Sequence, residues 1–355
     1  MKKKLAIWMG YSEIFNFKNY KNKKMGGSEL SALRFIDSFK DEYDIYVFGN
    51  SNNKNDIVTI NGVHWSILSE YNSTQNKLNV KWDVLIIFRY INFFIYCPHD
   101  AKKTILWLED MVINYYYDGG ILPNLGQNLV YNCNYKIDKY VCLSQWHVDN
   151  MKKIYPFIEN EKYEIIQNPI NIPDNLKEDK KIKNKFIYVS DLSRGFEILL
   201  DCIIFLQNIF DDIKLVFFRK NELTDNMIEK LKKIKNVTAY GYEPPLKVHQ
   251  EMITSEYFFY PSIFFETFCC SAVEAQLYEC ICIYNNIGCL NETIGDRGLS
   301  IDYNPKELNY VEKTCSKIIE LINNDEIKKK FKEQVKNYAL STKMEKLKEK
   351  WNKIF

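Results

Sequence analysis

The chain has 355 residues, 46% of them hydrophobic and 15% aromatic, which predicts two domains that each have a hydrophobic core. Its formal net charge of +2 is close to neutral and no basic stripe runs along its main body, which argues against a nucleic-acid binder. The ten cysteines form no CxxC pair and the four histidines are scattered, which argues against a zinc site and favours a reduced, intracellular protein.

Short apolar runs alternate with helical patterns through the chain, which is typical of α/β proteins with doubly wound parallel sheets. In the first half, we expect helices at 28–39 and at 144–155, the second capped by Ser144. We expect the first strand to lie near an edge of its sheet. The predicted strands of this half are 4–9, 43–48, 63–68, 82–88, 103–108, 139–144 and 163–168.

No segment is expected to cross a membrane. The most apolar segment after the first strand, 84–97, is interrupted by Arg89 and Asn92 and is too short to span a bilayer. The N-terminus lacks the longer apolar core and the small-residue cleavage site of a signal peptide. We therefore expect a cytoplasmic protein without a transmembrane segment.

A polar, charged stretch divides the chain. Residues 173–185 are the predicted linker between a first domain, 1–172, and a second domain, 186–325, with C-terminal helices over 326–355. Two similar α/β halves predict a cleft between facing sheets, with ligands at the carboxyl ends of the strands. The predicted strands of the second domain are 185–190, 213–218, 237–242, 257–262, 280–285 and 299–302, and its predicted helices are 194–210, 226–234, 246–253, 270–279 and 311–323.

Two glutamates, Glu266 and Glu274, flank a small and nearly uncharged stretch. On one continuous helix they would lie roughly 12 Å apart along the axis, whereas paired hydrolytic carboxylates lie about 5 to 9.5 Å apart. The spacing therefore favours two separate contacts with one long ligand. Pro261 ends the preceding strand, so Glu266 is expected in the loop and Glu274 inside a helix that begins near Phe268 or Cys269.

The first turn of that helix presents free N–H groups and a partial positive charge, which suit an anion or a hydroxyl-rich ligand. The small residues of 269–272 would let such a ligand approach closely. Near the N-terminus, Gly26 and Gly27 precede a helix that begins at about Ser28. They form either a phosphate-facing loop or only a tight turn.

Two glutamates separated by seven residues, after a strand that ends in Pro-Ser, resemble the signature of retaining glycosyltransferases with the GT-B fold, the glycogen-synthase-like group 1. The resemblance covers nearly the whole chain in the correct order. Besides the glutamate loop, the segments that are similar to the family are 25–35, 140–151, 163–171, 185–202, 237–262 and 285–302.

The resemblance implies transfer of a hexose from a nucleotide-diphosphate sugar, most often UDP- or GDP-linked, to a hydroxyl of a glycan, glycoconjugate or other acceptor, with retention and without a metal or other cofactor. The second domain would bind the donor, with Glu274 on the ribose and Glu266 beside the sugar. The first domain would bind the acceptor, and the last C-terminal helix would pack back on it. Peripheral contact of the basic C-terminal stretch with a membrane surface stays open. The further donor-binding candidates are Arg194, Phe268, Cys269, Cys270, Ser271, Gly26, Gly27, Arg219, Lys220 and Tyr242.

The chain also departs from the family pattern. Thr267 and Cys269 stand where the family often has glycines, and Asp191 replaces an arginine for which Arg219 and Lys220 are candidate substitutes. In the first domain Asp110 is retained as a catalytic candidate, but Glu109 replaces the histidine that commonly precedes it. Glu109 would bind an acceptor hydroxyl or would mark weakened catalysis. Two alternatives therefore stay open: a weakened or inactive nucleotide-sugar- or glycan-binding protein, and a GT-B sugar-nucleotide epimerase.

Overall fold

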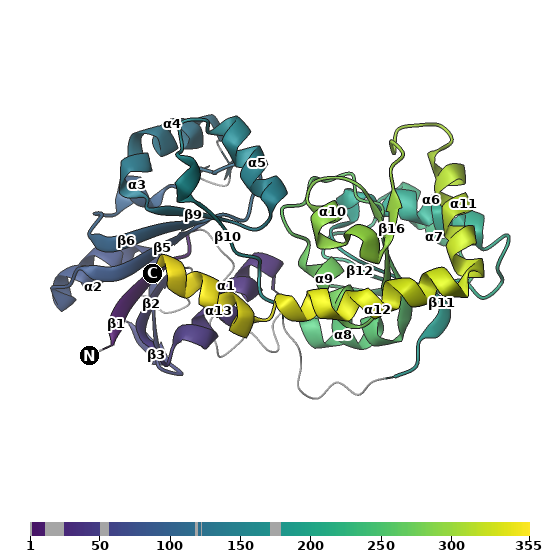
Figure 1. Cartoon of the computed structure of the whole chain (residues 1–355), viewed down its shortest axis with the longest axis horizontal. Helices are drawn as coiled ribbons and strands as arrows, with labels where there is room; N and C mark the ends of the chain where they lie inside the picture. Colours follow the sequence, from purple (N-terminus) through teal and green to yellow (C-terminus); the bar gives the residue numbers. More distant parts are fainter. Residues whose placement is uncertain (1, 11–24, 50–56, 118–119, 122, 171–178) are drawn as a thin grey trace. The chain divides into compact units, whose positions relative to one another are not determined.

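The computed structural model describes residues 2–10, 25–49, 57–117, 120–121, 123–170 and 179–355. The chain forms two compact units, one of residues 1–169 with 344–355 and one of residues 170–343 (Figure 1). Each unit is an α/β sheet with helices against it. The fold class predicted from the sequence, two doubly wound parallel-sheet domains, is confirmed.

The first unit contains an eight-stranded sheet in the order β10-β9-β6-β5-β1-β2-β4-β3. All of its pairings are parallel except the one between β3 and β4. Its strands are β1 (Lys3–Trp8), β2 (Tyr43–Gly49), β3 (Val58–Ile60), β4 (Val63–Ile67), β5 (Trp82–Phe88), β6 (Ala101–Trp107), β9 (Lys139–Cys142) and β10 (Tyr163–Ile165), and a separate hairpin joins β7 (Tyr116–Tyr117) to β8 (Gly120–Ile121).

The expected edge position of the first strand is wrong. β1 lies between β2 and β5, so Leu5 pairs with both Ile45 and Val84. Lysines lie at the amino end of the strand, where the Nζ of Lys4 is 2.7 Å from a carboxylate oxygen of Asp44. The interior of the strand is fully buried, as a central strand requires.

Helices cover the sheet of the first unit. Ser144 caps α5 as predicted, because its Oγ accepts a hydrogen bond from the backbone N–H of His147 at 3.0 Å. The last helix of the chain, α13, belongs to this unit and inserts the fully buried Trp351 against Phe35 and Trp107. The helices are α1 (Gly27–Phe39), α2 (Tyr71–Leu78), α3 (Phe93–Tyr96), α4 (Pro123–Cys133), α5 (Gln145–Ile154) and α13 (Met344–Ile354).

The second unit contains a six-stranded parallel sheet in the order β13-β12-β11-β14-β15-β16. β14 and β15 are buried along their whole length, which explains their nearly continuous apolar and aromatic sequence. The strands are β11 (Ile182–Val189), β12 (Lys214–Phe218), β13 (Val237–Tyr240), β14 (Ser255–Tyr260), β15 (Ile281–Asn285) and β16 (Leu299–Ile301).

The helices of the second unit cover both faces of its sheet. From β11 the chain proceeds to β12 on one side, and from β14 it proceeds to β15 on the other, so right-handed connections put α6 and α9 on opposite faces. α11 packs on α6 and α12 packs on α9 (Figure 1). The helices are α6 (Phe196–Leu206), α7 (Asp225–Leu231), α8 (Pro245–Thr254), α9 (Cys270–Leu277), α10 (Leu290–Thr293), α11 (Tyr310–Asn323) and α12 (Asp325–Ser341).

Two expected boundaries differ from the structure. β11 begins at Ile182, so residues 182–185 of the expected linker form a strand, while 173–178 lie outside the described residues. Of the C-terminal helices, α13 belongs to the first unit and packs on α1. α12 stays with the second unit, because its buried face, including Val335 and Ala339, packs against α9. Among the helices that the structure describes, none is long and apolar enough to cross a bilayer.

Candidate functional site

The sheet of the second unit reverses its strand order between β11 and β14. The loop after β11, residues 190–195, and the loop after β14, residues 261–269, leave the same edge of the sheet toward opposite faces. In doubly wound sheets this edge forms the crevice where ligands bind. Most of the candidates of the second unit, including Arg194 and Glu266, lie in these two loops or at the start of α9.

Glu266 is held by residues from both sides of this reversal. Its Oε1 lies 2.7 Å from a guanidinium nitrogen of Arg194 and also accepts a hydrogen bond from the hydroxyl of Tyr260. The guanidinium of Arg194 stacks over the ring of Phe264, with 4.1 Å between the guanidinium carbon and the ring centroid. Only 7% of the surface of Glu266 is exposed, so its position is fixed by these partners.

Burial and charge set the protonation of this group. Burial lowers the pKa of Arg194, but the charge of Glu266 and the contacts with Tyr260 together raise it above its ordinary value. The pKa of Tyr260 is raised well above its ordinary value, first by burial and then by Glu266. Tyr260 therefore stays protonated, and its hydroxyl donates a hydrogen bond to the carboxylate of Glu266.

Two glycines pack closely against the backbone of the loop that carries Glu266. Gly195 has a φ of +103°, and a Cβ on it would lie 2.1 Å from the carbonyl oxygen of Pro261. Gly288 has a φ of +61°, and a Cβ there would lie 2.7 Å from the backbone nitrogen of Glu266. The N–H of Cys289 also donates to the carbonyl of Glu266 at 2.9 Å. The position of Glu266 thus depends on close backbone packing.

The helix that follows begins at Cys270, close to the predicted start. Cys269 precedes it in the left-handed conformation, with a φ of 65°, where glycine is the usual residue. The carbonyl of Phe268 accepts a hydrogen bond from Thr293 at 2.7 Å. Cys270 and Ser271 form the first turn of α9, so this turn carries the partial positive charge of the helix N-terminus.

Glu274 lies on the second turn of α9 with 13% of its side chain exposed. Its Oε1 lies 3.6 Å from Nε2 of His249, a buried side chain of α8. The Nδ1 of the same histidine is 2.7 Å from the hydroxyl of Tyr278. Glu266 in the loop and Glu274 in the helix therefore have the local settings that the sequence predicts.

The remaining candidates of the second unit follow β12 and β13 at the same edge of the sheet. Asp191 accepts a hydrogen bond from Asn221 at 2.7 Å, and the guanidinium of Arg219 lies 3.3 Å from the carbonyl of Asn221. Lys220 lies over the ring of Tyr242, with 5.3 Å between Nζ and the ring centroid. These side chains therefore form a separate group beside the loop after β11.

The first unit holds a second group of polar residues at the carboxyl ends of its strands. Arg89, at the end of β5, forms two hydrogen bonds of 3.0 Å to the two carboxylate oxygens of Asp110, which follows β6. The backbone of Arg89 is left-handed, with a φ of 66°. Burial lowers the pKa of Arg89, but the charge and the hydrogen bonds of Asp110, together with Tyr90 and Glu109, raise it above its ordinary value. Asp110 is therefore tied to its neighbouring strand.

Glu109 connects this group to Ser28, which directly follows Gly26 and Gly27. Its Oε2 accepts hydrogen bonds from Ser28 at 3.1 Å and from Asn168 at 2.9 Å. Burial raises the pKa of Glu109 to about 8. Gly26 precedes α1 and Gly27 is its first residue; a Cβ on Gly26 would lie 2.5 Å from a carboxylate oxygen of Glu29.

Several residues of these groups were not predicted from the sequence. Arg89 was recognised only as an interruption of an apolar run, although its place directly after a strand could have marked it as a site residue. No local motif marks Asn168 or Tyr260. Asn168 contacts Glu109, which is distant in sequence, and Tyr260 contacts Glu266 across a turn.

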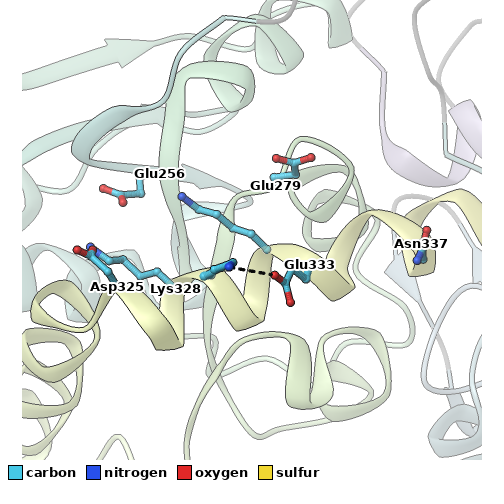
Figure 2. Close-up of a pocket in the computed structure, with 8 residues that line it drawn as sticks. Glu256, Glu279, Asp325, Lys328, Glu333 and Asn337 are labelled. Carbon is cyan, nitrogen blue, oxygen red and sulfur yellow. Dashed lines mark ion pairs between the residues drawn. The ribbon is translucent and has the colours of Figure 1, made fainter.

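A pocket in the second unit lies away from the candidate residues. Figure 2 shows the residues that line this pocket. Most of them belong to α12, and the others are Glu256, near the amino end of β14, and Glu279, which precedes β15. The pocket is therefore at the opposite edge of the sheet from Glu266. Its lining mixes acidic side chains with lysines, and Lys329 and Glu333 form an ion pair. The pocket therefore does not present charges of a single sign to a ligand.

In the part of the chain that the structure describes, no group of three or more His, Cys, Asp and Glu side chains could hold a metal ion.

Comparisons with known proteins agree with this architecture. Residues 171–338 match the family "Glycosyl transferases group 1", a region that contains Arg194, Glu266 and Glu274. An uncharacterized 41.2 kDa protein in the cps region of Klebsiella pneumoniae is 27% identical over 210 residues, which cover 57% of this chain and 54% of that protein. The chain thus spans about half the length of this curated relative.

Solved structures share the fold at low sequence identity. The sucrose-phosphate synthase of Thermosynechococcus elongatus is 11% identical, with a TM-score of 0.69 over 99% of this chain and 98% of its own. A TarM mutant of S. aureus, in complex with Fondaparinux, alpha-GlcNAc-glycerol and UDP, is 17% identical, with a TM-score of 0.62 over 84% of this chain and 61% of its own. The GT-B fold and the group 1 resemblance predicted from the sequence are confirmed.

Proposed function

We propose that this chain, whose residues 171–338 match the group 1 glycosyltransferases, transfers a sugar from a nucleotide-diphosphate sugar to a hydroxyl acceptor. The observation that carries the proposal is the pairing of Arg194 with Glu266 between two loops at the strand-order reversal of the second sheet. A charged pair held by buried partners at this edge is suited to binding a charged, hydroxylated ligand.

Each part of a donor has a matching group in the second unit. In our proposal Glu266 accepts a hydroxyl of the donor sugar, while Arg194 and the first turn of α9 neutralise the diphosphate. Glu274, on the next turn of α9, accepts the ribose hydroxyls. The N–H groups from Phe268 to Ser271 approach the sugar and the diphosphate.

We further propose that transfer proceeds with retention and without a metal. The arginine and the helix start would carry the charge of the departing diphosphate, which is the part that a metal supplies elsewhere. No protein nucleophile is needed if the departing phosphate oxygen takes the proton of the incoming hydroxyl. The first unit would bind the acceptor, with Glu109 and Asp110 beside it.

The donor and the acceptor are proposed from the compared proteins. UDP is bound in the TarM structure, so a UDP-sugar is the first donor to test, followed by a GDP-sugar. The cps-region relative supports testing a glycan or glycoconjugate as the acceptor, and we propose that the step is cytoplasmic.

The proposal is tested by following nucleotide release from a panel of UDP-, GDP- and TDP-sugars with hydroxyl acceptors. We expect the wild type to release nucleotide from at least one donor in an acceptor-dependent way, and Glu266→Gln to lose about a hundred-fold or more in rate. Glu320→Gln, an exposed substitution on α11, is the matched control and should leave the rate unchanged.

The other outcomes separate the alternatives. Tight binding of a nucleotide sugar without turnover would instead support a binding protein. Release of nucleotide with no acceptor would support an epimerase. A wild type that neither binds nor turns over any of the donors would refute the glycosyltransferase, the nucleotide-sugar-binding protein and the epimerase.

A further inference from the structure

His249 is a buried side chain whose second ring nitrogen has a specific neighbour. The residue lies on α8 with no exposed surface, and its Nδ1 is 2.7 Å from the hydroxyl of Tyr278. Its Nε2 is buried and makes no hydrogen bond within 3.5 Å, yet it lies 3.6 Å from Oε1 of Glu274. A buried donor or acceptor that is left unsatisfied costs free energy, so this arrangement calls for a role.

The surroundings determine which nitrogen carries the proton of the neutral ring. If Nδ1 carried it, the lone pair of Nε2 would face the carboxylate of Glu274, and two acceptors would oppose each other. If the hydroxyl of Tyr278 donates to Nδ1, the proton is on Nε2 and faces the carboxylate, which is favourable. Tyr278 is able to donate, because burial and then the charge of Glu274 raise its pKa above the ordinary value.

We propose that His249 is a positioning residue for Glu274: Tyr278 fixes its tautomer, and its Nε2–H directs the carboxylate of Glu274 toward the ribose of a bound nucleotide. This inference rests on the proposed function of the second unit. The 3.6 Å between Nε2 of His249 and Oε1 of Glu274 is longer than a hydrogen bond by less than about 1 Å. A small rotation of the Glu274 side chain on ribose binding therefore forms the hydrogen bond between them. His249 itself touches no substrate.

The test measures nucleotide affinity with and without the ribose hydroxyls. UDP and GDP, each with its 2′,3′-dideoxy form, are titrated into the full chain by calorimetry. The nucleotide that the wild type binds should bind about ten-fold or more tightly than its dideoxy form. In His249→Phe we expect affinity for the full nucleotide to fall about ten-fold and the preference over the dideoxy form to disappear, with affinity for the dideoxy form unchanged.

Conservative variants separate positioning from packing. His249→Gln places an amide N–H near the place of Nε2 and should restore most of the preference. Tyr278→Phe removes the donor that selects the tautomer and should weaken the preference in part. Tyr257→Phe removes another buried hydroxyl, which makes no hydrogen bond in the structure, and should leave the preference unchanged. In turnover assays, His249→Phe should raise the donor KM and change kcat little.

Failure of the inference and failure of the proposed function are distinguishable. If the wild type prefers the full nucleotide and His249→Phe keeps that preference, or if His249→Gln loses it as fully as His249→Phe, the positioning role is wrong and the glycosyltransferase proposal stands. If the wild type binds neither nucleotide and releases none from any donor, the function fails and the inference fails with it. Should His249→Phe not fold, Tyr278→Phe with an unchanged preference overturns the inference.

Discussion

Two buried or nearly buried carboxyl groups of the candidate sites have different partners. Glu266 contacts the guanidinium of Arg194, a permanent cation. Oε2 of Glu109 accepts hydrogen bonds from the neutral side chains of Ser28 and Asn168. Because burial is the largest influence on Glu109, its pKa rises from 4.5 to about 8.

The raised pKa of Glu109 predicts a pH-dependent cost to stability. Below about pH 4.5 the residue is protonated in both the folded and the unfolded chain, and it contributes no cost. Between about 4.5 and 8 the unfolded chain binds fewer protons than the folded one, so the free energy of unfolding falls as the pH rises. One such group contributes at most about 1.4 kcal/mol per pH unit.

Glu109→Gln removes this titration, so the stability of the variant relative to the wild type should increase from pH 5 to pH 8 and level off above that. Urea denaturation at a series of pH values measures the difference. Glu161→Gln, in the same unit, is the control and should run parallel to the wild type. A difference between Glu109→Gln and the wild type that stays constant with pH would contradict the prediction.

At the scale of elements, the close contact between the loops after β11 and β14 depends on one glycine. Gly195→Ala would place a methyl group 2.1 Å from the carbonyl oxygen of Pro261, at a φ of +103° that L-residues rarely adopt. We expect a loss of about 2 kcal/mol or more in stability, together with weaker nucleotide binding, because the loop that carries Glu266 must move.

Gly241→Ala is the matched control at the same edge of the sheet, since a Cβ there meets nothing within 4 Å. It should unfold and bind nucleotide like the wild type. Denaturant unfolding and calorimetry measure both properties. Equal effects of the two substitutions would mean that the contact with Pro261 does not hold the loop.

The elements that could be predicted from the sequence are those with a strong local pattern. The strands β14 and β15 were predicted within a few residues because fully buried parallel strands are continuous apolar runs. α2 was missed because its sequence, YNSTQNKL, carries no apolar stripe. β3 was missed because it is only three residues long and pairs antiparallel to β4.

Residue pairs were less predictable than elements. The spacing of Glu266 and Glu274 predicted their places in the loop and in the helix, because those depend on Pro261 and on the helix start. It did not predict Tyr260 or His249 as their neighbours, because side-chain contacts between elements require the packing of the sheet. The central position of β1 likewise depends on which strands pair, and no local pattern encodes that pairing.

At the scale of the whole molecule, the chain passes from the first unit to the second after residue 169 and returns after residue 343. The returning segment is α13, whose Trp351 is fully buried. Its ring lies 4.8 Å from that of Phe35 and 4.9 Å from that of Trp107, both edge-on. The last eleven-residue helix is therefore part of the core of the first unit.

This arrangement predicts that damage at the C-terminus weakens the N-terminal unit. Trp351→Ala removes a large buried side chain, which typically costs about 3 to 5 kcal/mol. Because its ring contacts lie within the first unit, hydrogen exchange should accelerate in β1 and β6 and stay unchanged in β14 and β15. Tyr135→Ala, in the same unit but with a side chain that is 79% exposed, should leave exchange unchanged throughout. Faster exchange in β14 and β15 as well would show that the two units unfold together, and no change in β1 and β6 would show that α13 adds little to the core.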